Sequence, residues 1–192
     1  MDPTNLMQPL GVNIDLIDAV MDRPDLHVPR PASVMKGYYA DPAALERLIA
    51  SGDPLHYETF EKDIPQEHGH LVFCISKLQP GLVGEEFFMT KGHFHEAPEM
   101  AEIYLCIRGC GYMLMKTSRD GSGRSDCVAE PMVRNRLVYV PPYWAHRSIN
   151  TGVEPLISLC IYPGGAGHDF DDIREHGFPK RIFKVEGKEV IR

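Results

Sequence analysis

The chain has 192 residues, of which 43% are hydrophobic and 24% charged, a composition typical of a globular protein and not of a disordered one. Its formal net charge is −7 and no basic stripe runs along it, which argues against binding to nucleic-acid backbones but leaves a small anionic substrate open. The five cysteines include no CxxC pair, and neither a signal-peptide pattern nor a membrane-length apolar run is found. We therefore expect a cytoplasmic protein with reduced thiols.

The N-terminal part of the chain is expected to form an extended arm followed by one helix. Residues 1–35 are rich in proline and aspartate and show little periodicity, which is typical of an arm. In the segment 41–52, Asp41 can accept hydrogen bonds from free amides, Pro42 suits the first turn, and Gly52 can end the helix. One face of this segment is apolar, through Leu45, Leu48 and Ile49.

After the helix the apolar residues recur with a period of two, which is the pattern of β-strands. Strands are expected at residues 71–78, 85–89, 102–107, 111–116, 137–140 and 155–162, with a last one at 181–185. Turn-rich pieces separate these segments without intervening helices, which favours an antiparallel sandwich or small barrel. We predict an all-β fold with an arm and helix at 1–54, a barrel at 55–180 and a tail at 181–192.

Three separate segments carry residues that can bind a metal. His93 and His95 project to one face if their segment is a strand, because side chains alternate along it. Glu102 and Tyr104 lie opposite the apolar face of 102–107, so we expect them inside the barrel, although an exposed Glu102 fits this strand equally well. His146 follows a Pro-Pro turn, where a single histidine is more often structural. Together the segments supply three imidazoles and one carboxylate, a set suited to iron, manganese, zinc or nickel.

The order of these residues, with H-x-H first, then a glutamate and a later histidine, resembles the cupin superfamily. Within it, four motifs are similar to those of the archaeal-type, cupin phosphoglucose isomerases: TKGHFH at 90–95, AEIY at 101–104, VYVPPYWAHR at 138–147 and IYPGGAGHD at 161–169. The similarity covers roughly residues 55–180. The chain departs from the family at Ser76, where threonine is expected, and in a longer loop at 118–127. It departs from most cupins at Asn135, where their second motif starts with glycine.

The resemblance implies a small cupin, or jelly-roll, barrel that interconverts glucose 6-phosphate and fructose 6-phosphate. It implies one divalent metal per chain, with iron as the first choice and manganese, zinc or nickel as alternatives, held by His93, His95, Glu102 and His146. It also implies a phosphate site at Ser76, Thr90 and Gly92, and a sugar pocket lined by Tyr57, Tyr104, Tyr143, Tyr162 and His168. No nucleic-acid or membrane partner is expected, and pairing through sheet edges and the arm predicts a homodimer.

The sequence leaves the chemistry of this site open. Our hypothesis is proton transfer through an enediol with Glu102 as base, although one group then serves both as base and as metal ligand. Tyr104 and His168 could orient the sugar, relay a proton or assist ring opening, and a direct hydride shift is the other route. Competing functions are isomerisation of a different phosphosugar, an iron-dependent dioxygenase, and a sugar-binding cupin without turnover.

Overall fold

The computed structural model describes residues 7–16, 18, 20–117 and 126–192. Residues 118–125 of the loop expected at 118–127 therefore lie outside the described residues. Within the described part of the chain every strand pair is antiparallel, so the prediction of an all-β fold is confirmed. Neither α-helix in these residues has the length and apolar run that crossing a bilayer needs.

The N-terminal segment contains paired short strands, an edge strand and the predicted helix. Its elements are β1 (Ile14–Asp15), β2 (Val20–Met21), β3 (Leu26–Pro31), the 3-10 helix η1 (Ala32–Met35) and α1 (Pro42–Ala50). Asp41 caps α1 as expected, because its carboxylate accepts a hydrogen bond of 2.9 Å from the backbone N–H of Ala44. The helix is therefore confirmed to within two residues at its C-terminal end.

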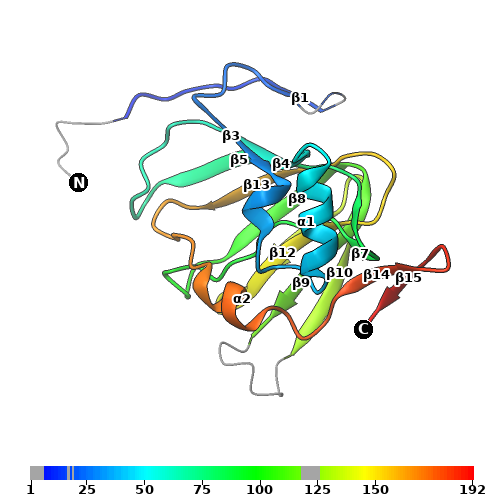
Figure 1. Cartoon of the computed structure of the whole chain (residues 1–192). Helices are drawn as coiled ribbons and strands as arrows, with labels where there is room; N and C mark the ends of the chain where they lie inside the picture. The colour runs from blue at the N-terminus through cyan, green and yellow to red at the C-terminus, as the bar shows by residue number, and fades with distance from the viewer. Residues whose placement is uncertain (1–6, 17, 19, 118–125) are drawn as a thin grey trace.

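Two sheets form the barrel (Figure 1). The larger has the order β11-β8-β13-β5-β4-β3 and adds β4 (Leu55–Glu61), β5 (Leu71–Leu78), β8 (Glu102–Arg108), β11 (Leu137–Val140) and β13 (Leu156–Pro163). The smaller has the order β10-β9-β12, with β9 (Cys110–Lys116), β10 (Cys127–Val133) and β12 (Ala145–Asn150). Buried side chains of both sheets, such as Val72 and Met113, belong to one hydrophobic cluster, so the core lies between the sheets.

The C-terminal residues return along the barrel and pair with strands from the middle of the chain. A third sheet has the order β15-β14-β7-β6 and consists of β6 (Leu82–Val83), β7 (Glu86–Phe87), β14 (Ile182–Val185) and β15 (Lys188–Ile191). A short helix, α2 (Asp171–His176), lies between β13 and this sheet in the sequence. Strand pairing between β14 and β7 fixes the C-terminal residues against the barrel.

The outer face of the larger sheet is covered by the N-terminal arm, which runs across the top of the molecule in Figure 1. A second hydrophobic cluster joins Met21 of the arm to Ile75, Ile107 and Ile157 of the sheet. Ile107 thus packs outward while Glu102 and Tyr104 of the same strand are buried on the side of the cavity. The inward-facing arrangement predicted for these two residues is confirmed.

Two expected strands differ from the structure. The strand at 85–89 is shorter than expected: only Glu86 and Phe87 form β7, and Met89 pairs with Ile149 through an isolated bridge. The segment of His93 is not a regular strand; it pairs only through isolated bridges, one of them between His93 and His146. The helix α2 was not expected, since six residues are too few to show a helical period.

Candidate metal centre and its cavity

Four side chains from three segments meet at one point inside the barrel. One ligand atom from each of His93, His95, Glu102 and His146 lies within 4.8 Å of the others. His95, Glu102 and His146 are buried and His93 is half-buried. The structure therefore brings together all four residues that the sequence suggested as metal ligands, and a single divalent ion is the species that such a donor set fits.

Backbone pairing explains why these residues converge. The N–H of His93 donates to the carbonyl of His146 at 3.2 Å, and the N–H of His146 donates back to His93 at 3.1 Å. Because β12 also pairs with β9, His146 is held from both sides. Glu102 begins β8, opposite Val140 of β11, at the edge of the same cavity.

Hydrogen bonds around the cluster direct ring nitrogens toward the carboxylate. Nδ1 of His95 donates to the carbonyl of Met100 at 2.9 Å, which leaves Nε2 facing Glu102 Oε2 at 3.2 Å. Nε2 of His146 lies 3.0 Å from the same Glu102 oxygen and 3.1 Å from the Tyr104 hydroxyl. When one ring nitrogen of a histidine donates its hydrogen to a carbonyl, the other nitrogen keeps its lone pair and can bind a metal.

The electrostatics of the cluster favour a cation at its centre. Burial would raise the pKa of Glu102, but hydrogen bonds and charge attraction from His146 and His95 lower that pKa to about 2. Burial lowers the pKa of His95, but the hydrogen bond and charge attraction to Glu102 and the hydrogen bond to Met100 together outweigh this and raise the pKa overall. Burial and the neighbouring histidines keep the pKa of His93 well below its usual range. Nε2 of His93 has no hydrogen-bond partner among the described residues, so a buried lone pair is left for a bound ion.

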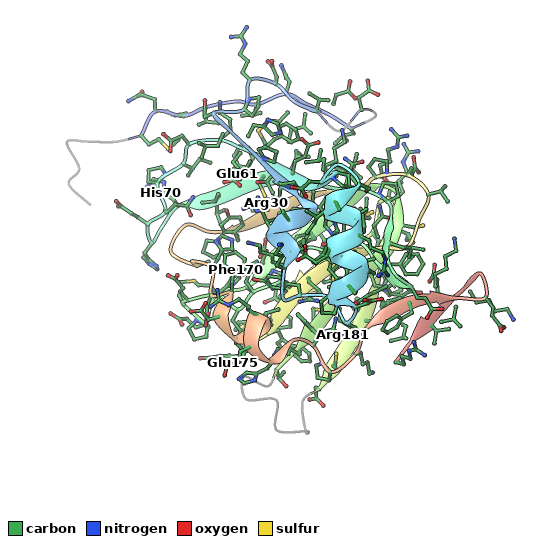
Figure 2. All side chains as sticks on the ribbon, viewed as in Figure 1. Arg30, Glu61, His70, Phe170, Glu175 and Arg181 are labelled. Carbon is green, nitrogen blue, oxygen red and sulfur yellow. The ribbon has the colours of Figure 1, made fainter. Side chains whose placement is uncertain are left out.

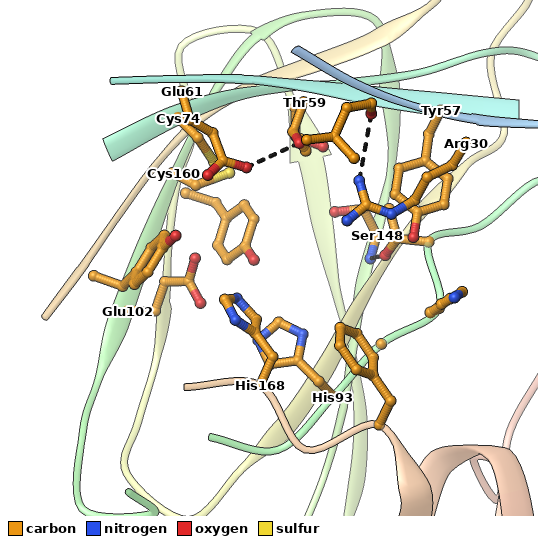
Figure 3. A pocket seen from close by; sticks show the side chains of 18 residues that line it. Arg30, Tyr57, Thr59, Glu61, Cys74, His93, Glu102, Ser148, Cys160 and His168 are labelled. Atoms are coloured by element: carbon orange, nitrogen blue, oxygen red, sulfur yellow. Dashed lines mark hydrogen bonds between the residues drawn. The ribbon is translucent and has the colours of Figure 1, made fainter. Parts of the chain in front are cut away.

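The cluster forms one end of a cavity of about 340 Å³. Figure 3 shows Glu102, His93 and His168 together at one end and Arg30, Tyr57 and Ser148 at the other. The imidazole ring of His168 lies 4.4 Å from that of His93 and stacks on Phe170 at 5.9 Å, measured between ring centroids. Burial lowers the pKa of His168, so the ring is neutral near pH 7.

Most of the residues that the sequence suggested for substrate binding line this cavity. They are Tyr57, Ser76, Thr90, Gly92, Tyr104, Tyr162 and His168. Tyr143 does not line it: its side chain is exposed and its φ is +69°, in the turn that follows the two prolines. This turn directs the backbone of Tyr143 to Pro98, whose carbonyl accepts its N–H at 2.6 Å, and not toward the metal cluster. The expected place of Tyr143 in the pocket is thus corrected.

Several cavity residues were missed from the sequence. Thr59 and Glu61 follow Tyr57 at a spacing of two along β4, so recognition of this strand could have found them. Arg30 comes from β3, and its guanidinium carbon lies 5.1 Å from the centre of the Tyr57 ring. Arg30 and Phe170, labelled in Figure 2, belong to opposite ends of the chain, and nothing in the sequence places them in one cavity.

Comparisons with known proteins identify relatives of this chain over most of its length. The family model described as glucose-6-phosphate isomerase matches residues 29–191. The chain is 42% identical to a glucose-6-phosphate isomerase of Thermococcus litoralis over 96% of this chain and 94% of that protein. It is 46% identical to one of Thermococcus onnurineus, over 95% and 92% of the two chains. A solved oxalate decarboxylase overlaps 56% of this chain and 26% of its own at 21% identity, with a TM-score of 0.43.

Proposed function

The chain belongs to the glucose-6-phosphate isomerase family, and we propose that it interconverts glucose 6-phosphate and fructose 6-phosphate with one bound divalent metal. The observation that carries this proposal is the cluster of three histidines and one glutamate in the wall of a cavity that also presents hydroxyl groups and cations. Relatives named for this reaction match almost the whole length of the chain, which supports the same substrate class here.

In this proposal His93, His95, Glu102 and His146 hold the metal. A bound divalent ion supplies a Lewis acid that polarises the sugar carbonyl and stabilises the oxyanion that develops beside it. Iron is our first choice, with manganese, zinc and nickel as alternatives, because imidazole and carboxylate ligands suit all four. The orphaned Nε2 of His93 and the depressed pKa of Glu102 support this ligand set.

We assign the phosphate to the part of the cavity lined by Ser76, Thr90 and Gly92. The Thr90 hydroxyl oxygen accepts the Ser148 N–H at 3.1 Å, so its own hydrogen is available to a phosphate oxygen. Arg30 and Lys91 also line the cavity and add positive charge to this end. Tyr57 lies between Arg30 and the backbone of Lys91, where it can close the phosphate site from one side.

The proton is moved at the metal end. We assign Glu102 as the group that removes the proton from the carbon next to the carbonyl, by the enediol route, with a hydride shift as the other possibility. Tyr104 OH lies 3.1 Å from His146 Nε2, where it can orient a sugar hydroxyl. Burial lowers the pKa of His168, so its neutral ring can accept a proton during ring opening.

The proposal is tested by a coupled assay that converts fructose 6-phosphate to glucose 6-phosphate. The full-length protein is measured as purified, after chelation, and after addition of iron, manganese, zinc or nickel. We expect activity to fall on chelation and to return with at least one of these metals. Absence of turnover with every metal would reject the isomerase activity. Full activity in the chelated protein would reject the metal dependence but not the isomerase activity.

The role of Glu102 is tested with Glu102→Gln, measured by metal content and by exchange of the substrate proton with solvent. A variant that keeps its metal but loses exchange supports Glu102 as the base. If Glu102→Gln exchanges the substrate proton with solvent at the wild-type rate, the proton transfer belongs to another group. Mannose 6-phosphate serves as the control substrate for sugar specificity, because it differs from glucose 6-phosphate only in the configuration of the carbon next to the carbonyl.

A further inference from the structure

Arg147 is a buried cation that has no place in the reaction described so far. It follows the ligand His146 in β12 and is only 2% exposed. Among the described residues, no carboxylate forms an ion pair with it. Burial of an arginine without an ion pair is unfavourable, so packing alone does not account for a cation at this position.

The contacts of Arg147 lead to the turn at the phosphate end of the cavity. Nη2 donates to the carbonyl of Lys91 at 2.7 Å, and Nη1 lies 2.8 Å from the sulfur of Met89. The guanidinium carbon lies 4.4 Å from the centre of the Phe178 ring, which packs against its plane. The two ends of the guanidinium fork are therefore fixed, one of them on the Lys91–Gly92 peptide.

This contact determines where the N–H of Gly92 points. The peptide is trans, so its N–H and C=O groups point in opposite directions. Because the Lys91 carbonyl is directed to the buried guanidinium, the Gly92 N–H points away from it. That N–H has no hydrogen-bond partner among the described residues, and Gly92 lines the cavity. The turn thus offers a free amide donor beside the Thr90 hydroxyl.

The side chain of Arg147 also packs closely against Gly92. Gly92 has a φ of +76°, a backbone conformation that residues other than glycine rarely adopt. A Cβ at this position would lie 3.0 Å from Arg147 Cβ and 3.1 Å from Arg147 Nε. The turn therefore rests directly on the arginine side chain, and a change in Arg147 is transmitted to the Gly92 backbone.

We propose that Arg147 is a positioning residue for the phosphate end of the cavity. Its guanidinium fork holds the Lys91–Gly92 peptide so that the Gly92 N–H points toward a phosphate oxygen. Its buried positive charge also attracts the phosphate anion. This inference rests on the proposed function in that the anion is the phosphate of the substrate. Arg147 acts through Lys91 and Gly92 and does not touch the reacting carbon atoms.

The test measures binding of inorganic phosphate by calorimetry to the metal-loaded, full-length protein. Arg147→Met keeps the apolar stem but removes the fork and the charge, and we expect phosphate to bind about tenfold more weakly or worse. Arg147→Lys keeps the charge but cannot hold Met89 and Lys91 together, so we expect a smaller loss, about threefold. The control is Arg181→Met, which removes a nearby arginine paired with Glu86 at 2.7 Å.

Equal phosphate affinity in Arg147→Met and the wild type would overturn the proposal, as would an equal loss in Arg181→Met. If Arg147→Met does not fold, Arg147→Lys decides, and wild-type affinity in that variant rejects the role of the fork. With fructose 6-phosphate, we expect the KM of Arg147→Lys to rise while kcat stays within twofold, whereas a merely structural defect lowers both kcat and metal content. Because phosphate binding needs no turnover, failure of the isomerase assay and failure of this inference are distinguishable.

Discussion

Acid should destabilise this protein in part through His56, a residue of β4 with no exposed surface. Its Nε2 lies 2.7 Å from the Tyr39 hydroxyl, and its ring centre lies 3.9 Å from that of Phe88. The Tyr39 oxygen also accepts the N–H of Met89 at 3.2 Å, so the Tyr39 hydroxyl hydrogen is available to His56. Burial is the main reason that the pKa of His56 falls from 6.5 to about 3.

The sign and size of the effect follow from this depressed pKa. The unfolded chain binds a proton at His56 near pH 6.5 and the folded chain only near pH 3, so His56 adds stability above pH 6.5 that is lost as the pH falls toward 3. The loss approaches about 1.4 kcal/mol per pH unit. Between pH 6 and pH 4.5 it amounts to about 2 kcal/mol.

The measurement is urea unfolding of metal-free protein at these two pH values, for the wild type and for His56→Gln. Glutamine is neutral throughout this range, and every other titratable side chain is common to the two proteins. The wild type should therefore lose about 2 kcal/mol more than the variant between pH 6 and pH 4.5. Equal losses in the two proteins would refute the reasoning and show that His56 is not buried in its neutral form.

Four further predictions concern packing, metal and assembly. Lys116→Met should lower the unfolding free energy in urea by about 3–5 kcal/mol, because it leaves the buried Asp172 without its 2.6 Å partner; a loss below about 1 kcal/mol contradicts the pair. Divalent metal at about 100 times its Kd should add about 2.7 kcal/mol to the wild type but far less to His93→Ala, and equal gains would argue against the cluster. Gly111→Ala should cost about 1–3 kcal/mol or more, since its Cβ meets a backbone oxygen of β12, while Gly11→Ala in open space should cost little. Sedimentation should give a homodimer, and a monomer at all concentrations would reject the assembly.

The metal cluster could be predicted because each ligand lies in a short segment with a simple rule. Alternation along a strand places Glu102 and Tyr104 on one face, and the spacing of two places His93 beside His95. The meeting of His93 with His146 could not be derived in this way. It depends on an isolated bridge between residues 53 positions apart, and only the folded topology creates that bridge.

Proline explains why some strands were missed. Pro29 lies in β3 and Pro131 lies in β10, and both strands stand at the edge of a sheet. A proline cannot donate to a neighbouring strand, but at an edge one side needs no donor. The sequence thus argued against strands where the fold tolerates them, and the cavity residues Val28 and Arg30 of β3 were lost with them.

The C-terminal segment supports the cavity although it contributes no metal ligand. The Phe178 ring contacts two buried cations, with its centre 4.4 Å from the guanidinium carbon of Arg147 and 5.7 Å from the ammonium of Lys116. Lys116 also binds Asp172 in α2, directly after the cavity residues His168 and Phe170. The contacts of Phe178 and of the Lys116–Asp172 pair therefore reach both the α2 side of the cavity and, through Arg147, the turn that we propose for phosphate binding. Since neither the ring contacts of Phe178 nor the Lys116–Asp172 pair includes a metal ligand, a change at Phe178 or Asp172 should alter substrate affinity before it alters metal affinity.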